Sequence, residues 1–415
     1  MNGRLRPLEI GVSGDGIIVA LGRDLRSPER HDVGEGVILP SATDLHVHFR
    51  DPGGSRTVES FATGTVQAAL GGVGLVADMP NTIPTVTDAA RFEEKRSRVL
   101  GRAAVDVLLY GALITTSKLD ELATTVGALK LYLSPTTGVD TPPGHDEIPS
   151  LLRRAAATGL PLTVHAEDPQ KFRLDPPPRS LSDWDCSRPE VAEEAAVSEV
   201  IAAAPRGLRL HFAHVTSSRV ADRIAKAGHS FEASPHHLLL SRESRLGSRA
   251  KVNPPLRSEA KRSELWARFA GGGIPCVASD HAPHDVAEKD RPFELAPSGM
   301  PNVETMVPLL LAKVRAGDID LARLVAVAMD RPSRWVGLPR GRIALGHRAD
   351  LIVVDFRDRR TITAKDLHAP CGWSAFEGRE GIFPREHYRA GERIVFEGEY
   401  IGTPTGVLRR PEFAM

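Results

Sequence analysis

A short apolar run, a polar loop and an amphipathic stretch recur along most of this sequence, and this recurrence limits the possible folds more than any other feature. Apolar runs of this length suit strands that helices cover on both faces. Helices are expected between them, for example over 57–70 and 88–100. Eight strand–helix units in series predict an α/β fold, a (β/α)8 TIM-like barrel. The candidate strands are 44–48, 74–79, 106–110, 128–132, 162–165, 210–214, 230–233 and 276–280.

A doubly wound sheet is the alternative arrangement of such units. That fold usually carries a glycine-rich phosphate-binding turn after a strand. Neither GxGxxG nor GxxxxGK[ST] follows a candidate strand in this sequence. We therefore prefer the barrel, and assign it to residues 43–339.

The two ends of the chain differ from this middle part. Residues 1–42 and 340–415 are rich in glycine and in short β-like runs such as 17–21, 351–355 and 393–396. Each end is short for an independent domain. We therefore expect a small composite β-sandwich built jointly from both termini.

Composition excludes several classes of protein. The 415 residues include 53 basic and 53 acidic side chains, so the formal net charge is zero and no nucleic-acid partner is expected. The three cysteines form no CxxC motif, which fits a reducing compartment better than a disulfide scaffold. No apolar run approaches the roughly 20 residues of a membrane span, and no signal peptide is visible. These features predict a cytoplasmic protein without a membrane partner.

His46-Val47-His48 is the strongest local signal for chemistry. Side chains at positions i and i+2 of a strand share a face, so both imidazoles would point into the barrel while Val47 points outward. Two neutral imidazoles about 6.6 Å apart along a strand can converge on one Zn²⁺ ion. A chance pair of histidines in a loop is the competing interpretation.

Three further candidate strands end in residues of the metal-ligand type: His165, His214 and Asp280. A single histidine at a strand end is more often a core or surface residue. Barrel active sites, however, lie at the carboxyl ends of the strands. Several strands that end in such residues therefore favour one shared metal site.

Lys130 lies in the apolar run Ala-Leu-Lys-Leu-Tyr, and its sequence leaves two interpretations open. The side chain can extend from the strand end to water. Alternatively the neutral amine can combine with CO₂, and the resulting carbamate is an anionic ligand able to bridge two cations. A protonated amine cannot ligate a metal.

Arg50 and Asn81 follow two strand ends on loops. They are either a salt-bridged arginine and a turn asparagine, or a clamp for a substrate carboxylate, because arginine offers a planar fork of donors. Nucleophilic catalysis by a side chain is weakly supported, since GxSxG is absent and no cysteine lies beside an obvious base.

Motifs in a consistent order along nearly the whole chain resemble the dihydroorotases of the amidohydrolase superfamily. The tail GRIALGHRADLIVVD (341–355) is similar to the composite β-sandwich of that superfamily. The other matching segments are DLHVHFRDPG (44–53), ADMPNT (77–82), LKLYL (129–133), VHAED (164–168), HFAHVTS (211–217), SPHHLLL (234–240), KVNPPLR (251–257), ASDHAPH (278–284) and GMPNVETMVPLLL (299–311).

The resemblance implies two Zn²⁺ ions per subunit, bridged by carboxylated Lys130. One ion would be held by His46, His48, Lys130 and Asp280, and the other by Lys130, His165 and His214. Asp280 matches the family's catalytic acid and base. The matching substrate-binding positions are His48, Arg50, Asn81, Asn253, His284, Ser298 and Gly299.

Two positions depart from the family pattern. Ser234 replaces the usual threonine, which is a minor change, and Ser298 stands where an aromatic residue is frequent, which leaves the pocket wall open to question. His236 and His237 could hold an additional metal, but packing is the preferred interpretation.

The activity implied by the resemblance is the reversible, zinc-dependent cyclisation of N-carbamoyl-L-aspartate to (S)-dihydroorotate and water in pyrimidine biosynthesis. A hydantoinase or allantoinase would share the metal ligands and is the nearest alternative. A non-catalytic scaffold that partners aspartate transcarbamoylase is the alternative from another class. A small-molecule substrate and a homo-oligomer are expected, and association with aspartate transcarbamoylase is a further partner to consider.

Overall fold

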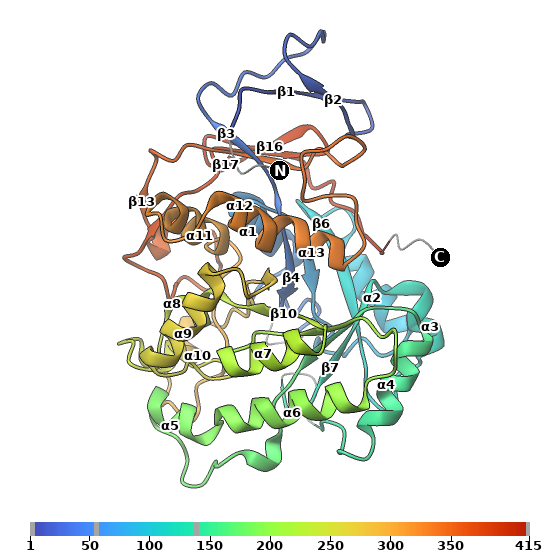
Figure 1. Cartoon of the computed structure of the whole chain (residues 1–415), viewed down its shortest axis with the longest axis vertical. Coiled ribbons are helices and arrows are strands. Elements are labelled where there is room, and N and C mark those ends of the chain that lie inside the picture. The colour runs from blue at the N-terminus through green and yellow to red at the C-terminus, as the bar shows by residue number, and fades with distance from the viewer. Residues whose placement is uncertain (1–4, 54–57, 137–140, 412–415) are drawn as a thin grey trace.

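Eight parallel strands form a barrel at the centre of the molecule, which confirms the predicted fold class (Figure 1). The computed structural model describes residues 5–53, 58–136 and 141–411. Neighbouring strands follow one another in chain order, and a parallel bridge between Val47 and His281 brings the two ends of the sheet together. The strands are β4 (Ala42–Val47), β5 (Val73–Asp78), β6 (Asp106–Ala112), β7 (Ala128–Tyr132), β8 (Leu162–His165), β9 (Leu210–Phe212), β10 (Ser230–Ala233) and β11 (Cys276–Val277).

Helices connect the strands and cover the outside of the barrel (Figure 1). None among the described residues is long and apolar enough to span a membrane. The helices are α1 (Phe61–Leu70), α2 (Ala89–Val99), α3 (Leu119–Thr125), α4 (Ile148–Ala157), α5 (Leu181–Ser187), α6 (Glu190–Ala203), α7 (Ser218–Lys226), α8 (Pro235–Leu239), α9 (Glu259–Ala270), α10 (Val286–Lys289), α11 (Met306–Arg315), α12 (Leu321–Leu324) and α13 (Arg331–Trp335), with a π-helical stretch at Val325–Asp330 and 3₁₀ turns at Pro169–Lys171, Gly247–Ala250 and Ala364–Asp366.

Some predicted element limits differ from the observed ones. The helix predicted over 57–70 begins only at Phe61, because Ser60 caps it by accepting a hydrogen bond from the Thr63 backbone N–H; Thr57 lies outside the described residues. The strands predicted over 210–214 and 276–280 end at Phe212 and Val277. Both segments leave the sheet there, before His214 and Asp280, the polar residues that the sequence analysis placed at the strand ends.

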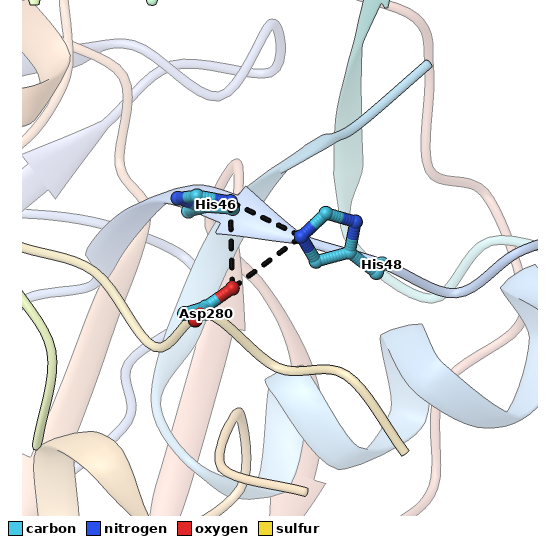
Figure 2. A group of neighbouring side chains, drawn as sticks. All are labelled: His46, His48 and Asp280. Atoms are coloured by element: carbon cyan, nitrogen blue, oxygen red, sulfur yellow. Dashed lines mark hydrogen bonds and ion pairs between the residues drawn. The ribbon is translucent and has the colours of Figure 1, made fainter. Parts of the chain in front are cut away.

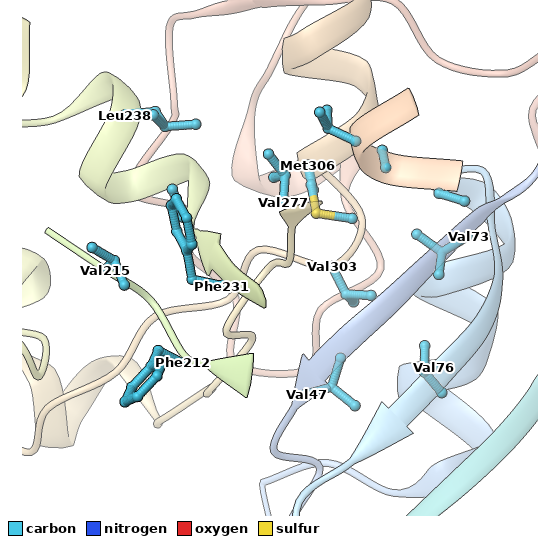
Figure 3. Close-up of a cluster of buried hydrophobic side chains, with 14 of the residues drawn as sticks. Val47, Val73, Val76, Phe212, Val215, Phe231, Leu238, Val277, Val303 and Met306 are labelled. Carbon is cyan, nitrogen blue, oxygen red and sulfur yellow. The ribbon is translucent and has the colours of Figure 1, made fainter. Parts of the chain in front are cut away.

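The barrel core has two faces because side chains alternate along each strand. Val76 of β5 belongs to the large cluster between the strands and the outer helices, together with Val47, and Figure 3 labels both among its members. Leu75 and Ala77 belong instead to a separate inner cluster. Val47 therefore points outward, as predicted, while its neighbours His46 and His48 point inward.

Strands from both termini form a second β-region, as predicted. A five-stranded sheet has the order β17-β16-β15-β12-β3, so that β3 from the N-terminal part pairs with β12 from the C-terminal part. The hairpin of β1 and β2 packs on it through a cluster that includes Ile18 and Leu351. The domain limits at 42/43 and 339/340 stay a prediction. The strands are β1 (Glu9–Val12), β2 (Ile18–Gly22), β3 (Val37–Pro40), β12 (Leu351–Val354), β15 (Glu386–Arg389), β16 (Glu392–Phe396) and β17 (Glu399–Tyr400), with a separate pair β13 (Arg360–Thr361) and β14 (Glu380–Gly381).

The C-terminal tail returns to the barrel after β17. Leu408 forms a parallel bridge with Val107 near the start of β6, and Arg409 pairs with Asp106, the first residue of that strand. Residues that follow the five-stranded sheet in the sequence therefore pair with the amino-terminal end of β6. The sequence analysis assigned these residues to the β-sandwich alone.

Candidate metal centre

Three side chains of the metal-ligand type meet at the carboxyl ends of β4 and β11 (Figure 2). The Nε2 atoms of His46 and His48 are 3.1 Å apart, and Asp280 Oδ1 lies 3.4 Å and 3.3 Å from them. All three residues are buried. In a tetrahedral site with bonds of about 2.1 Å, two ligand atoms are separated by about 3.4 Å. The observed separations therefore fit one divalent cation.

Lys130, His165 and His214 lie directly beside these three residues. Lys130 Nζ is 3.5 Å from His46 Nε2, and His165 Nδ1 is 2.9 Å from His214 Nε2. The rings of His46 and His214 have centroids 5.3 Å apart, which joins the two groups. The fold thus brings together all six side chains that the sequence analysis selected as candidate ligands.

Burial sets the charge state of these imidazoles. It holds the pKa of His46 well below the ordinary value, and the charge of Lys130 lowers it further. Burial likewise lowers the pKa of His214, with His165 and Lys130 adding to the effect. A neutral imidazole is the form that binds a metal. The cluster is therefore prepared to accept cations rather than anions at these nitrogens.

The two groups that would carry a negative charge are also perturbed. Burial lowers the pKa of Lys130 to about 8, so its neutral amine, the form that reacts with CO₂, is accessible near physiological pH. Burial alone would raise the pKa of Asp280, but its hydrogen bond to His48 and the nearby cations hold that pKa below the ordinary value. Asp280 is therefore ionised at neutral pH.

Unusual backbone conformations position three of the site residues. Arg50, His214 and Asp280 have φ values of 54°, 36° and 48°, in the left-handed region that residues with a side chain seldom adopt. Such conformations cost free energy and are concentrated at functional sites. At His214 and Asp280 they turn the chain out of the strand direction and aim the side chain at the cluster.

Buried carboxylates contact the ring nitrogens of His46 and His165 that face away from the cluster. Glu232 Oε1 is 2.6 Å from His46 Nδ1, while its other oxygen is 2.9 Å from His211 Nε2. Glu167 Oε2 is 2.8 Å from His165 Nε2, and Arg188 pairs with the same carboxylate. These contacts leave His46 Nε2 and His165 Nδ1 facing the cluster. Such partners fix the tautomer and orientation of a metal-binding imidazole.

The sequence analysis did not select Glu232 or Glu167. A signal was present, because Glu232 is an acid within the buried strand Ser230–Ala233, and burying an acid requires a partner. Glu167 lies two residues after His165 in an equally buried segment. The identity of their partners, however, depends on strands far apart in the sequence.

Arg50 and Asn81 lie on the open side of the cluster. Arg50 donates a hydrogen bond to the Pro283 carbonyl at 2.7 Å, and electrostatic attraction from Asp280 partly offsets the lowering of the Arg50 pKa by burial. Asn81 Oδ1 accepts a hydrogen bond from His48 Nδ1 at 2.7 Å. Asn81 therefore orients a candidate metal ligand in this state, in addition to the substrate contact expected from the sequence.

The remaining predicted substrate contacts gather around the loop after β11. His284 Nε2 donates a hydrogen bond to the Ser298 carbonyl at 3.0 Å. The Gly299 backbone N–H donates to the Lys251 carbonyl at 2.9 Å. Asn253 is half-buried, and its Oδ1 atom has no hydrogen-bond partner among the described residues. The Ser298–Gly299 backbone is thus held within the protein.

Several buried polar atoms at this end of the barrel have no partner among the residues that the structure describes. His214 Nδ1, Arg50 Nε and Asn253 Oδ1 are examples, as is His236 Nε2, which lies 3.8 Å from Asp280 Oδ2. Native proteins satisfy most such groups. His237 is partly satisfied, because its Nε2 donates to the Pro254 carbonyl at 3.0 Å, while its Nδ1 has no partner among the described residues.

Comparison with known proteins agrees with this geometry. Residues 35–134 match a family model described as dihydro-orotase-like. A dihydroorotase of Halobacterium salinarum is 39% identical over 359 residues, which cover 84% of this chain and 83% of that protein. A dihydroorotase of Methanosarcina acetivorans is 35% identical over 435 residues, covering 97% and 91%. Among solved structures, an L-hydantoinase (dihydropyrimidinase) from Arthrobacter aurescens is 25% identical with a TM-score of 0.90, covering 97% and 95%.

The barrel and its ligand cluster define the class of protein, which is an amidohydrolase-type enzyme acting on cyclic amides. Within this class, the identity and coverage shared with the archaeal relatives assign the chain to one group. The chain belongs to the dihydroorotase family.

Proposed function

We propose that this chain catalyses the reversible ring closure of N-carbamoyl-L-aspartate to (S)-dihydroorotate and water, a step of pyrimidine biosynthesis. The observation that carries the proposal is the convergence of His46, His48 and Asp280 at one point, with the half-buried Arg50 attracted electrostatically to Asp280. This combination provides a metal-binding centre next to a group suited to a carboxylate. Relatives named dihydroorotase support the choice of substrate.

The donor set fits two divalent cations, which we propose to be Zn²⁺. His46, His48, Lys130 and Asp280 would hold one ion, and Lys130, His165 and His214 the other, with Lys130 carboxylated and shared. Imidazole and carboxylate are ordinary zinc ligands. When bound, such ions polarise a carbonyl group and lower the pKa of a water molecule. The burial of Lys130, which lowers its pKa to about 8, supports carbamate formation.

Asp280 is the proposed catalytic acid and base. In ring opening, water adds to the ring carbonyl carbon, Asp280 takes a proton from that water, and the carbon–nitrogen bond breaks. Asp280 then delivers the proton to the departing ring nitrogen. Its depressed pKa keeps it ready to accept the first proton at neutral pH. Ring closure follows the same steps in reverse.

The substrate's other carboxylate does not react, and we propose that it is bound by Arg50, Asn81 and His284. Asn253 and the Ser298–Gly299 backbone would contact the ring. The unpartnered Arg50 Nε and Asn253 Oδ1 support this assignment, because substrate groups can complete their hydrogen bonds. Binding of this kind orients the reacting carbonyl as well as adding affinity.

The test is an assay of the purified, metal-loaded protein in both directions. We expect ring opening of dihydroorotate and ring closure of carbamoyl aspartate, with hydantoin and allantoin opened far more slowly. Hydantoinase activity is the second candidate, because solved hydantoinases share the fold at a TM-score of 0.90. Preferential opening of hydantoin would replace the proposal with that alternative. A non-catalytic scaffold is disfavoured, since all six candidate ligand positions are filled.

The carbamate has its own test. Lys130→Ala is expected to lose at least about 99% of the activity, because the shared ligand is absent, and short carboxylic acids should restore part of it by occupying the same space. Activity and zinc content are measured together. A Lys130→Ala protein with full zinc content and full activity would exclude the carbamate.

We further propose that the protein is cytoplasmic and forms a homo-oligomer. Association with aspartate transcarbamoylase is a finer proposal, motivated by the shared pathway. Size-exclusion chromatography with light scattering, with and without that enzyme, distinguishes the two kinds of assembly.

A further inference from the structure

Lys289 ends the short helix α10 (Val286–Lys289) in the loop that follows Asp280, and its side chain is fully buried. Its Nζ atom donates hydrogen bonds to three backbone carbonyls: Pro297 at 2.8 Å, Gly299 at 2.9 Å and Lys251 at 3.2 Å. An ammonium group has three hydrogens, so its donor capacity is used completely. One side chain therefore joins two chain segments.

These carbonyls flank the peptide that closes the substrate side of the site. The Ser298 carbonyl accepts a hydrogen bond from His284, and the Gly299 N–H donates to Lys251. Gly299 has a φ of +133°, and a Cβ atom there would come within 2.6 Å of the Ala282 carbonyl oxygen. The peptide between Ser298 and Gly299 is thus held in one orientation by hydrogen bonds from His284 to the Ser298 carbonyl and from Lys289 to the Gly299 carbonyl.

Trp373 reinforces the same arrangement from the C-terminal part of the chain. Its indole N–H donates to the His284 backbone carbonyl at 2.8 Å. The Lys289 ammonium lies over the Trp373 ring, 5.7 Å from its centroid, at a distance where a cation is attracted to an aromatic face. Lys289 and His284 therefore both contact Trp373.

Lys289 is also one of three neighbouring basic side chains, together with the buried Lys251 and the half-buried Arg50. Lys251 Nζ donates to the Phe293 carbonyl at 2.8 Å and lies over the Trp184 ring. Among the described residues, neither lysine forms an ion pair with a carboxylate, although Glu294 acts on Lys251 at longer range. Burial lowers the pKa of Lys289 to about 7, and the charges of Lys251 and Arg50 contribute. Buried cations without a counter-ion favour an anionic ligand.

We infer that Lys289 is a positioning residue for the unreactive carboxylate of the substrate: it fixes the Ser298–Gly299 peptide and His284, and with Lys251 and Arg50 it makes the pocket select a ring that carries a carboxylate. This inference rests on the proposed function. It assigns Lys289 no contact with the reacting atoms. The predicted consequence is weaker substrate binding, rather than lost metal, when the ammonium is removed.

The experiment compares Lys289→Met with wild type as full-length, metal-loaded protein. Methionine matches the length of the lysine stem but cannot donate to the three carbonyls. We expect KM for dihydroorotate and the dissociation constant of orotate, an unreactive ring carboxylate, to rise by about tenfold or more, since bonds from a charged donor are lost. The turnover number should change less than KM, and zinc content should stay at the wild-type level.

Two controls separate positioning from lost stability. Lys313→Met removes a lysine that pairs with Asp318 at the exposed end of α11, and should leave KM unchanged. Val99→Ala opens a small cavity at the end of α2, and should lower the melting temperature without raising KM. A role of Lys289 in stability alone would reproduce the Val99→Ala pattern, and would overturn the inference.

Each remaining outcome has a defined meaning. KM and orotate affinity within about twofold of wild type, in a folded Lys289→Met protein, reject the inference while leaving the proposed function intact. Wild-type protein that opens no dihydroorotate rejects the proposed function instead. Should Lys289→Met fail to fold, Lys289→Arg keeps the charge but not the three-carbonyl geometry. An unchanged KM in that variant would equally reject the positioning role.

Discussion

At the amino-terminal end of the barrel strands a buried acid is surrounded by cations, whereas at the carboxyl-terminal end buried imidazoles lie against one another. Burial opposes the ionisation of Asp106, but four arginines hold its pKa far below the ordinary value. Both of its carboxylate oxygens are paired. The arginines are Arg340 at 3.5 Å, Arg348 at 3.6 Å, Arg389 at 3.0 Å and Arg409 at 2.6 Å.

The carboxyl-terminal end lacks this compensation. His46 and His214 have pKa values well below the ordinary one, and His214 Nδ1 has no partner among the described residues. The carboxylate of Asp106 is therefore compensated by arginines, although Arg340 Nη1 has no partner among the described residues, whereas His214 at the other end lacks such a charged partner among them. Strongly perturbed buried groups of the second kind are candidates for a functional site.

The largest expected effect on activity concerns the carboxyl-terminal end of the barrel strands. Asp280→Asn should lower kcat for dihydroorotate by at least about 10³-fold, because the amide cannot accept and return the proton. The melting temperature of the metal-free protein should fall only modestly, since the amide keeps the size of the carboxylate but loses its charge interactions with His46 and His48. Steady-state kinetics and calorimetry measure the two quantities. Activity within tenfold of wild type would show that another group moves the proton.

Arg50→Ala should have the next largest effect, a loss of about 100-fold in kcat/KM, because the substrate carboxylate loses a charged donor and its orientation. Arg219→Ala, which removes an exposed arginine paired with Glu194 on the outer surface, is the matched control. A loss below about threefold would reject the proposed role of Arg50.

At the amino-terminal end of the barrel strands we expect the opposite pattern, a loss of stability with little change in activity. Asp106→Asn should destabilise the fold by about 3 kcal/mol, because Arg389 and Arg409 lose their carboxylate partner, while Arg340 and Arg348 keep only Asp350. Thermal unfolding should reveal this loss, while kcat of the protein that remains folded should change little. A large fall in kcat without a fall in melting temperature would mean that the two ends are coupled.

The direction of the Asp106 pKa shift determines how the stability difference between wild type and Asp106→Asn depends on pH. The pKa of Asp106 is lower in the folded than in the unfolded state, so its stabilisation is present above the unfolded value of about 3.9 and is lost as the pH falls towards the folded value. The melting temperatures of wild type and Asp106→Asn should therefore differ at pH 7 and converge below about pH 4. A constant difference would contradict the assigned cause.

The smallest effect is expected at Glu232, which supports a candidate ligand without reaching the centre. Glu232→Gln should weaken zinc affinity by about tenfold, because a neutral amide holds the His46 ring less firmly and leaves its nitrogen less basic. Competition with a chromogenic chelator measures the affinity independently of activity. An unchanged zinc affinity would assign Glu232 to packing between β4, β9 and β10.

Most of the barrel could be predicted from local sequence, because apolar runs bounded by glycine and polar residues specify strands and helices within a few positions. The pair His46 and His48 was equally readable, since a period of two places both on one face. Strand ends were less accessible. The left-handed turns at His214 and Asp280 depend on packing around them, and neither histidine nor aspartate requires that conformation.

Contacts between distant segments set the limit of sequence reasoning about the site. Glu232 meets His46 across 186 positions, and Trp373 meets His284 across 89, so neither pairing follows from local pattern. The pairing of the tail with β6 was missed for the same reason. The side chains selected from motifs were brought together, whereas their supports became visible only in three dimensions.

Pairing of β3 with β12 has a consequence for synthesis on the ribosome. Val37–Pro40 emerges before any of the barrel, yet its partner Leu351–Val354 emerges after all of it. During translation this apolar strand has no hydrogen-bonding neighbour on that side, and an unpaired edge invites contacts with other nascent chains. The earliest strand of this sheet therefore stays without its partner for the longest part of synthesis.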